Sequence, residues 1–104
     1  MSNRGDTATA ALEGRERRVD ELIATIAGLR SPEEAGRFLR DLCTRHELEA
    51  MAQRWDVARL VDQGAPYLEI ARRTGASTAT ITRVAQWVHH GEGGYREVIE
   101  RGAK

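Results

Sequence analysis

The chain of 104 residues has little of what marks several large classes of protein. Its single cysteine, Cys43, excludes a disulfide within the chain and fits a reducing compartment. No apolar run approaches the roughly 20 residues that cross a bilayer, and the polar N-terminus has no signal-peptide core. We therefore expect a cytoplasmic protein without membrane contact.

The formal net charge is zero, because 16 lysines and arginines balance 16 aspartates and glutamates. Overall charge therefore gives no indication of a nucleic-acid partner. The balance changes between Gly64 and Gly91, where three arginines accompany a single acid, Glu69. This local bias is compatible with a surface that faces DNA, although it is weak evidence alone.

What the sequence does have is helical periodicity, without strand alternation or an internal repeat. We predict an all-α fold of five to six helices within residues 15–104. Residues 1–14 lack a period and are expected to form a disordered arm. Ser31 and Thr44 are each followed three residues later by a glutamate, which predicts capped helix starts at both positions. The helix after Thr44 should stop at Gly64.

Residues 66–90 are predicted to form a helix-turn-helix, with two short helices joined by residues 75–77. Ala71 provides the small residue needed where the helices cross, and Gly75 suits the turn. Ser77 is a good N-cap for the second helix. The apolar residues expected to pack around the crossing are Ile70, Ala76, Ile81 and Val84.

Short side chains occupy the outward face of the second helix, which allows close approach to base edges in the major groove. Arginines at the end of the first helix are placed to contact phosphates. The candidate DNA-binding residues are Arg72, Arg73, Ser77, Thr78, Ala79, Thr80, Thr82 and Arg83. Two alternatives stay open: an ordinary helical hairpin with a glycine turn, and a helix-turn-helix that contacts a protein.

The segments 38–44, 52–55, 59–61 and 74–83 resemble the tryptophan repressor superfamily, and within it the YerC/YecD branch. The resemblance covers about residues 18–100. It implies an intertwined all-helical homodimer of the Trp-repressor type, in which helices of both chains build a shared core. The two helix-turn-helix units would face successive major grooves of a palindromic operator, with half-sites about 34 Å apart.

The resemblance also implies two ligand-holding arginines, because Arg54 and Arg83 match the positions that hold free tryptophan in the true repressor. The next residue is Val84, where the repressor has a glycine. A branched side chain there should fill the ligand space. We therefore expect regulation without tryptophan as corepressor, with Arg54 paired to a nearby acid, Arg83 on phosphate, and any other effector unknown.

Other combinations of residues indicate no chemistry of their own. Cys43, His46 and the pair His89-His90 do not match known zinc-ligand spacings, so no metal or cofactor is expected. Neither a catalytic triad nor a pair of catalytic carboxylates is visible, which argues against an enzyme. Trp55 is expected in the core, and Trp87 against the last helix or a partner chain.

The prediction is thus a sequence-specific, DNA-binding transcriptional regulator, most simply a repressor, that acts as a homodimer. The alternative is a non-enzymatic adaptor that uses the same helices against a protein partner.

Overall fold

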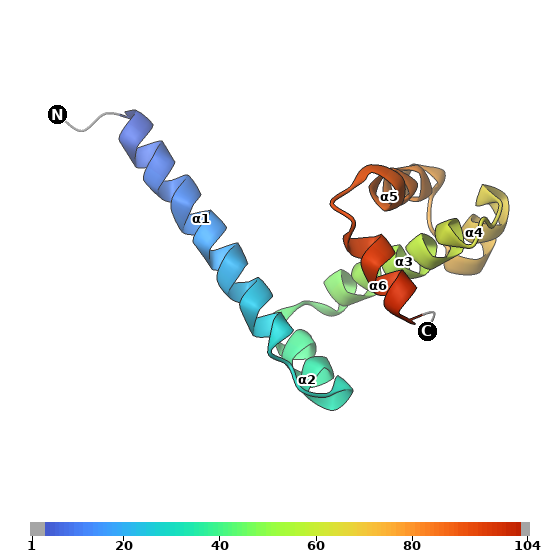
Figure 1. Cartoon of the computed structure of the whole chain (residues 1–104), viewed down its shortest axis with the longest axis horizontal. Coiled ribbons are helices and arrows are strands. Elements are labelled where there is room, and N and C mark those ends of the chain that lie inside the picture. Colours follow the sequence, from blue (N-terminus) through green and yellow to red (C-terminus); the bar gives the residue numbers. More distant parts are fainter. Residues whose placement is uncertain (1–3, 103–104) are drawn as a thin grey trace. The chain divides into compact units, whose positions relative to one another are not determined.

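The computed structural model describes residues 4–102, and all regular structure among them is helical (Figure 1). This confirms the predicted all-α fold with six helices. The chain forms two compact units, one up to Leu42 and one from Cys43 onward. Within the described range, no helix combines the length and the hydropathy required to cross a membrane.

The first unit contains α1 (Arg4–Ala27) and α2 (Pro32–Leu42). The predicted disordered arm is therefore wrong for residues 4–14, which are helical, while residues 1–3 lie outside the described part. Ala8, Ala10 and Ala11 explain the difference, because alanine has the highest helix propensity and needs no amphipathic pattern. The absence of a period indicated only that this segment has no apolar face.

The start of α2 forms as the sequence predicts. The Ser31 hydroxyl accepts a hydrogen bond of 3.0 Å from the Glu34 backbone N–H, and Pro32 occupies the first helical position. Despite their apolar residues, neither α1 nor α2 buries any described side chain. Val19, Ile23 and Ile26 of α1 are all exposed.

The second unit contains α3 (Arg45–Asp62), α4 (Tyr67–Thr74), α5 (Thr78–His90) and α6 (Gly94–Gly102). Helix α3 begins with the predicted capping box. The Glu47 N–H donates to the Thr44 hydroxyl (3.0 Å), and the Thr44 N–H donates to the Glu47 carboxylate (2.7 Å). The helix ends at Asp62, shortly before Gly64 turns the chain with a positive φ of 80°.

The core of the second unit lies where α4 and α5 pack on α3, and α6 also contacts α3 and α5 (Figure 1). Burying one valine or isoleucine side chain stabilises a fold by about 1.5–3 kcal/mol. Because the buried side chains come from α3, α4 and α5 together, their packing fixes how these helices cross. The members of this core are Val57, Ala58, Leu60, Val61, Ile70, Ala76, Ile81, Val84, Ala85 and Val88.

Candidate nucleic-acid interface

The turn between α4 and α5 depends on a left-handed glycine and on Thr74. Gly75 has φ 75°, a conformation that residues with a Cβ seldom adopt, and its N–H donates to the Ala71 carbonyl. The Thr74 hydroxyl donates to the Ile70 carbonyl (2.7 Å) and accepts from the Ala76 N–H (3.1 Å). In the turn that joins the two short helices, the Thr74 hydroxyl and the Gly75 and Ala76 N–H groups all have hydrogen-bond partners.

A further hydrogen bond ties this turn to α3. The Gln53 side-chain amide donates to the Thr74 carbonyl at 3.1 Å. Sequence reasoning missed both Thr74 and Gln53. Threonine directly before a turn glycine is a recognisable local signal, since its hydroxyl can bond nearby backbone groups. Gln53 lies 21 residues from Thr74 and gives no such signal.

The inner face of the motif packs as predicted. Ile70 and Ile81 are fully buried, Val84 is 1% exposed, and Ala76 is also in the core. Ala71 is half-buried against this cluster. The predicted spacing of small and branched residues therefore corresponds to the contacts that set the crossing of α4 and α5.

The start of α5 is held by a pair of hydroxyl side chains. The Ser77 hydroxyl accepts from the Thr80 backbone N–H and donates to the Thr80 hydroxyl, each at 3.1 Å. Ser77 is thus the N-cap, as predicted. Two of the candidate DNA-binding side chains are therefore engaged with each other and fix the first turn.

The remaining candidates of α5 are exposed: Thr78, Ala79, Thr82 and Arg83. The first turn of the helix contains no acid, so the positive end of its dipole is not neutralised there. Arg72 and Arg73, in the last turn of α4, are also exposed, and the Arg73 guanidinium lies 3.7 Å from the Glu69 carboxylate. The motif thus contains both the positive, N-terminal end of α5 and the arginine-bearing, C-terminal end of α4.

The positions implied for a tryptophan ligand are less well organised. Arg54 and Arg83 are both exposed, and neither lines the aromatic groove or the polar groove of the second unit. The ion pair expected for Arg54 does not occur among the described residues. The reason is local, because the residues one turn away along α3 are Ala50, Met51, Val57 and Ala58.

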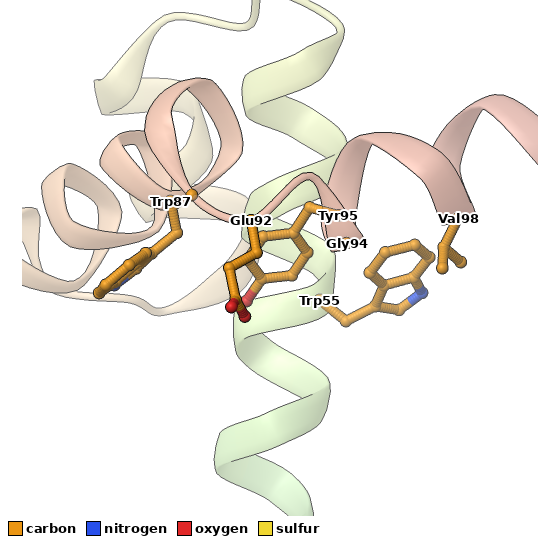
Figure 2. Close-up of a pocket in the computed structure, with 7 residues that line it drawn as sticks. Trp55, Trp87, Glu92, Gly94, Tyr95 and Val98 are labelled. Carbon is orange, nitrogen blue, oxygen red and sulfur yellow. The ribbon is translucent and has the colours of Figure 1, made fainter. Parts of the chain in front are cut away.

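The larger of these cavities is an open aromatic groove of about 910 Å³ (Figure 2). Trp55 of α3 and Tyr95 of α6 stack with ring centroids 6.4 Å apart, and Arg59 lies over the Trp55 ring. Trp55 is half-buried against the core rather than enclosed in it. The groove is lined by Trp55, Trp87, Gly91, Glu92, Gly94, Tyr95 and Val98.

The smaller cavity, of about 230 Å³, is a polar groove between α3 and α4. Asp56 pairs with Arg59 beside it, and Arg73 lines the same space. The negative ends of α3 and α4 lie near this groove, so it is poorly suited to an anion. Within residues 4–102, no group of three or more metal-ligating side chains is present.

Comparison with known proteins places this geometry in a family. The family model described as Trp repressor protein matches residues 17–103. The uncharacterized protein YerC of Bacillus subtilis (strain 168) is 42% identical over 90 residues, which cover 86% of this chain and 85% of that protein.

Solved structures agree with this result. A TrpR like protein from Eubacterium eligens ATCC 27750 superposes with a TM-score of 0.80 and 40% identity, covering 84% of this chain and 90% of that one. A protein from Staphylococcus aureus gives a TM-score of 0.79 and 38% identity, covering 84% of this chain and 87% of that one. The resemblance seen in the sequence is confirmed, and the chain belongs to the Trp repressor protein family, a family of regulatory DNA-binding proteins.

Proposed function

We propose that this protein is a sequence-specific transcriptional regulator that binds a palindromic operator as a homodimer and represses by blocking access to a promoter. The observation that carries the proposal is the division of α5 into two faces. Ile81, Val84, Ala85 and Val88 are buried, whereas the short side chains at its N-terminal end are exposed. A rigid helix with a short, uncharged tip is suited to entering a major groove.

Each candidate residue has a part in this proposal. Thr78, Ala79 and Thr82 face the base edges, and Arg83 contacts phosphate. Ser77 and Thr80 hold the first turn of α5 through their shared hydrogen bonds. The two arginines that end α4, Arg72 and Arg73, contact the phosphate backbone and fix the register of the motif on the duplex.

The homodimer is supported by apolar surface that one chain leaves uncovered. Helix α1 has a stripe formed by Val19, Leu22, Ile23 and Ile26, and every one of these side chains is exposed. Helix α2 likewise buries nothing. Contiguous exposed apolar faces are a usual mark of an interface. Two copies related by a two-fold axis would cover them and present two recognition helices to one operator.

The aromatic groove is the surface that we assign to the second copy. Glu92 provides the single acidic group among its lining residues. On α1, Arg15 lies one turn before Val19 on the same face and matches Glu92 in charge, while Glu16 lies at the flank of that face. A second copy of α1 therefore fits the groove in both hydrophobicity and charge.

Tryptophan is not required in this proposal. Val84 is 1% exposed and belongs to the core of the motif, so its side chain occupies space that a glycine would leave empty. Both expected arginines are exposed to solvent. We therefore expect DNA affinity to be the same with and without free tryptophan.

Selection of genomic fragments by the purified full-length protein, with and without tryptophan at near-physiological salt, tests the proposal. A palindrome recovered equally in both samples is the expected result. A palindrome recovered only with tryptophan would contradict the role given to Val84. Enrichment of no fragment would overturn the DNA-binding regulator and favour the protein-interaction adaptor.

A matched pair of variants tests the recognition helix. Thr82→Asp places a carboxylate against the groove and should abolish operator binding with helicity unchanged. Thr9→Asp makes the same change at an exposed site in α1, outside the motif, and should leave operator affinity intact. For the wild type, affinity should fall with salt by a slope of about −0.9 per phosphate contact on a log–log scale. Equal binding by Thr82→Asp would show that α5 does not enter the groove.

A further inference from the structure

The tip of α5 offers a restricted set of chemical groups to DNA. Of the residues from 77 to 83, Ile81 is buried in the core. The hydroxyls of Ser77 and Thr80 bond to each other, and Ser77 also accepts the Thr80 N–H. Three exposed, short side chains are then left to reach the bases: Thr78, Ala79 and Thr82.

These three side chains lie close together on one face of α5. Thr78 and Thr82 are four residues apart, and Ala79 and Thr82 are three apart, so they share one side of the helix. Arg83 is turned from Thr82 by about 100° and from Ala79 by about 40°, so it lies at the edge of this face, where the proposed function assigns it to a phosphate contact. At a rise of about 1.5 Å per residue, Thr78 and Thr82 are about 6 Å apart along the axis, close to two base-pair steps.

All three side chains carry a methyl group, and none has the paired donor and acceptor atoms that recognise guanine or adenine by two hydrogen bonds. A methyl can distinguish bases in the major groove by apolar contact with the C5-methyl group of thymine. We propose that the operator half-site is recognised through thymine methyl groups that pack against Thr78, Ala79 and Thr82. This inference rests on the proposed function and specifies the bases that the same site prefers.

Deoxyuridine substitution tests the inference directly, because it removes the C5-methyl group and keeps the base pair. Once selection has given an operator, each thymine of a half-site is replaced in turn, and the affinity of the full-length protein is measured. At two or three positions we expect affinity to fall about fourfold, the amount that corresponds to one buried methyl group. Thymines outside the half-site are the internal control.

Two variants of Thr82 separate the methyl group from the hydroxyl. Thr82→Val keeps a methyl and removes the hydroxyl, so it should retain the preference for thymine over uracil. Thr82→Ser keeps the hydroxyl and removes the methyl, so it should lose about fourfold in affinity for the thymine operator and no longer distinguish the uracil operator at that position. Because Thr82 is exposed, neither change should alter the thermal melting of the protein.

The outcomes distinguish failure of thymine recognition from failure of the proposed DNA-binding function. A specific operator whose uracil forms bind as tightly as the thymine form would overturn methyl recognition and leave the regulator standing. Loss of specificity in Thr82→Val but not in Thr82→Ser would assign recognition to the hydroxyl instead. If selection yields no operator, both the function and the inference are overturned.

Discussion

The two units of the chain contain similar helices, yet they differ in what their apolar side chains touch. Helix α1 has 24 residues and buries none of its described side chains. Helix α4 has eight residues and fully buries Ile70. Most helical stability in proteins comes from packing an apolar face, not from length or propensity. Within one chain, the short helix α4 is therefore stabilised by packing, whereas the long helix α1 is not.

This difference assigns a separate role to each unit: assembly to the first and the geometry of the motif to the second. The second unit has its own core, so the geometry of the α4–α5 motif is set within one chain. The first unit has amphipathic helices without a core, and we assign its apolar faces to contacts with a second copy. Changes in the first unit should therefore act on assembly, and changes in the second on the stability of the motif.

The largest effect is expected from Ile23→Asp in α1. Ile23 is 58% exposed in one chain, and a carboxylate there would be buried without a partner in the dimer. We expect dimerisation to weaken by at least about 100-fold, measured by light scattering or sedimentation across a dilution series. The control is Arg17→Asp, which introduces the same group on the opposite face of α1.

Two results would contradict the assignment of α1 to the dimer interface. One is an Ile23→Asp protein that stays dimeric at the same concentration as the wild type. The other is a wild-type protein that is monomeric at micromolar concentration and still has its full helical circular dichroism signal. Either would mean that the stripe on α1 does not form the interface.

The next largest effect is expected from Ile81→Ala in α5. Ile81 is fully buried at the crossing of the motif, so the change leaves a cavity and should lower the free energy of unfolding by about 2–5 kcal/mol. Urea denaturation at fixed protein concentration measures this loss. Gln86→Ala, on the exposed side of the same helix, should alter stability by no more than about 0.5 kcal/mol. Equal stability of the two variants would show that the core is not centred on Ile81.

The sequence predicts the second unit better than the first for a physical reason. The cap at Thr44, the turn at Gly75 and the buried positions Ile81 and Val84 are all specified by residues within a few positions of one another. Such short-range patterns are visible in a single sequence. The helical character of residues 4–14 was missed because an alanine-rich helix without an apolar face leaves no period to detect.

Features that depend on distant residues could not be predicted. The aromatic groove requires Trp55 of α3 to meet Tyr95 of α6, and nothing local links those two positions. The bond from Gln53 to the motif's turn is of the same kind. The roles of Arg72, Arg73 and Arg83 on DNA stay predictions, because exposure is necessary for a phosphate contact but does not demonstrate one.

A smaller effect is expected from Gly75→Ala at the turn of the motif. The nearest atom to an added Cβ is 3.9 Å away, so space is adequate, and the cost comes from φ 75° alone. A left-handed residue with a Cβ costs about 1–2 kcal/mol, which should appear as a lower melting temperature. Gly14→Ala is the matched control in α1. There φ is helical, so the same change should leave stability unchanged or slightly raise it.

The smallest effect concerns pH and Glu47 at the start of α3. The hydrogen bond from the Thr44 backbone N–H, and then that with the Thr44 side chain, lower the pKa of Glu47 below its ordinary value of 4.5, and nearby His46 adds to this, while slight burial opposes it. Because the folded pKa is the lower one, ionised Glu47 stabilises the fold above pH 4.5, and this contribution is lost as pH falls through the lowered value.

Glu47→Gln should therefore melt below the wild type at pH 7, and the two melting temperatures should converge as the pH falls well below 4.5. Glu49→Gln, two residues on, removes one negative charge from the same helix without touching the cap and serves as the control. A gap between wild type and Glu47→Gln that stays constant from pH 7 to pH 3 would mean that the cap does not depend on the ionised carboxylate. Thr44 alone would then hold the start of α3, and with it the helix on which the motif packs.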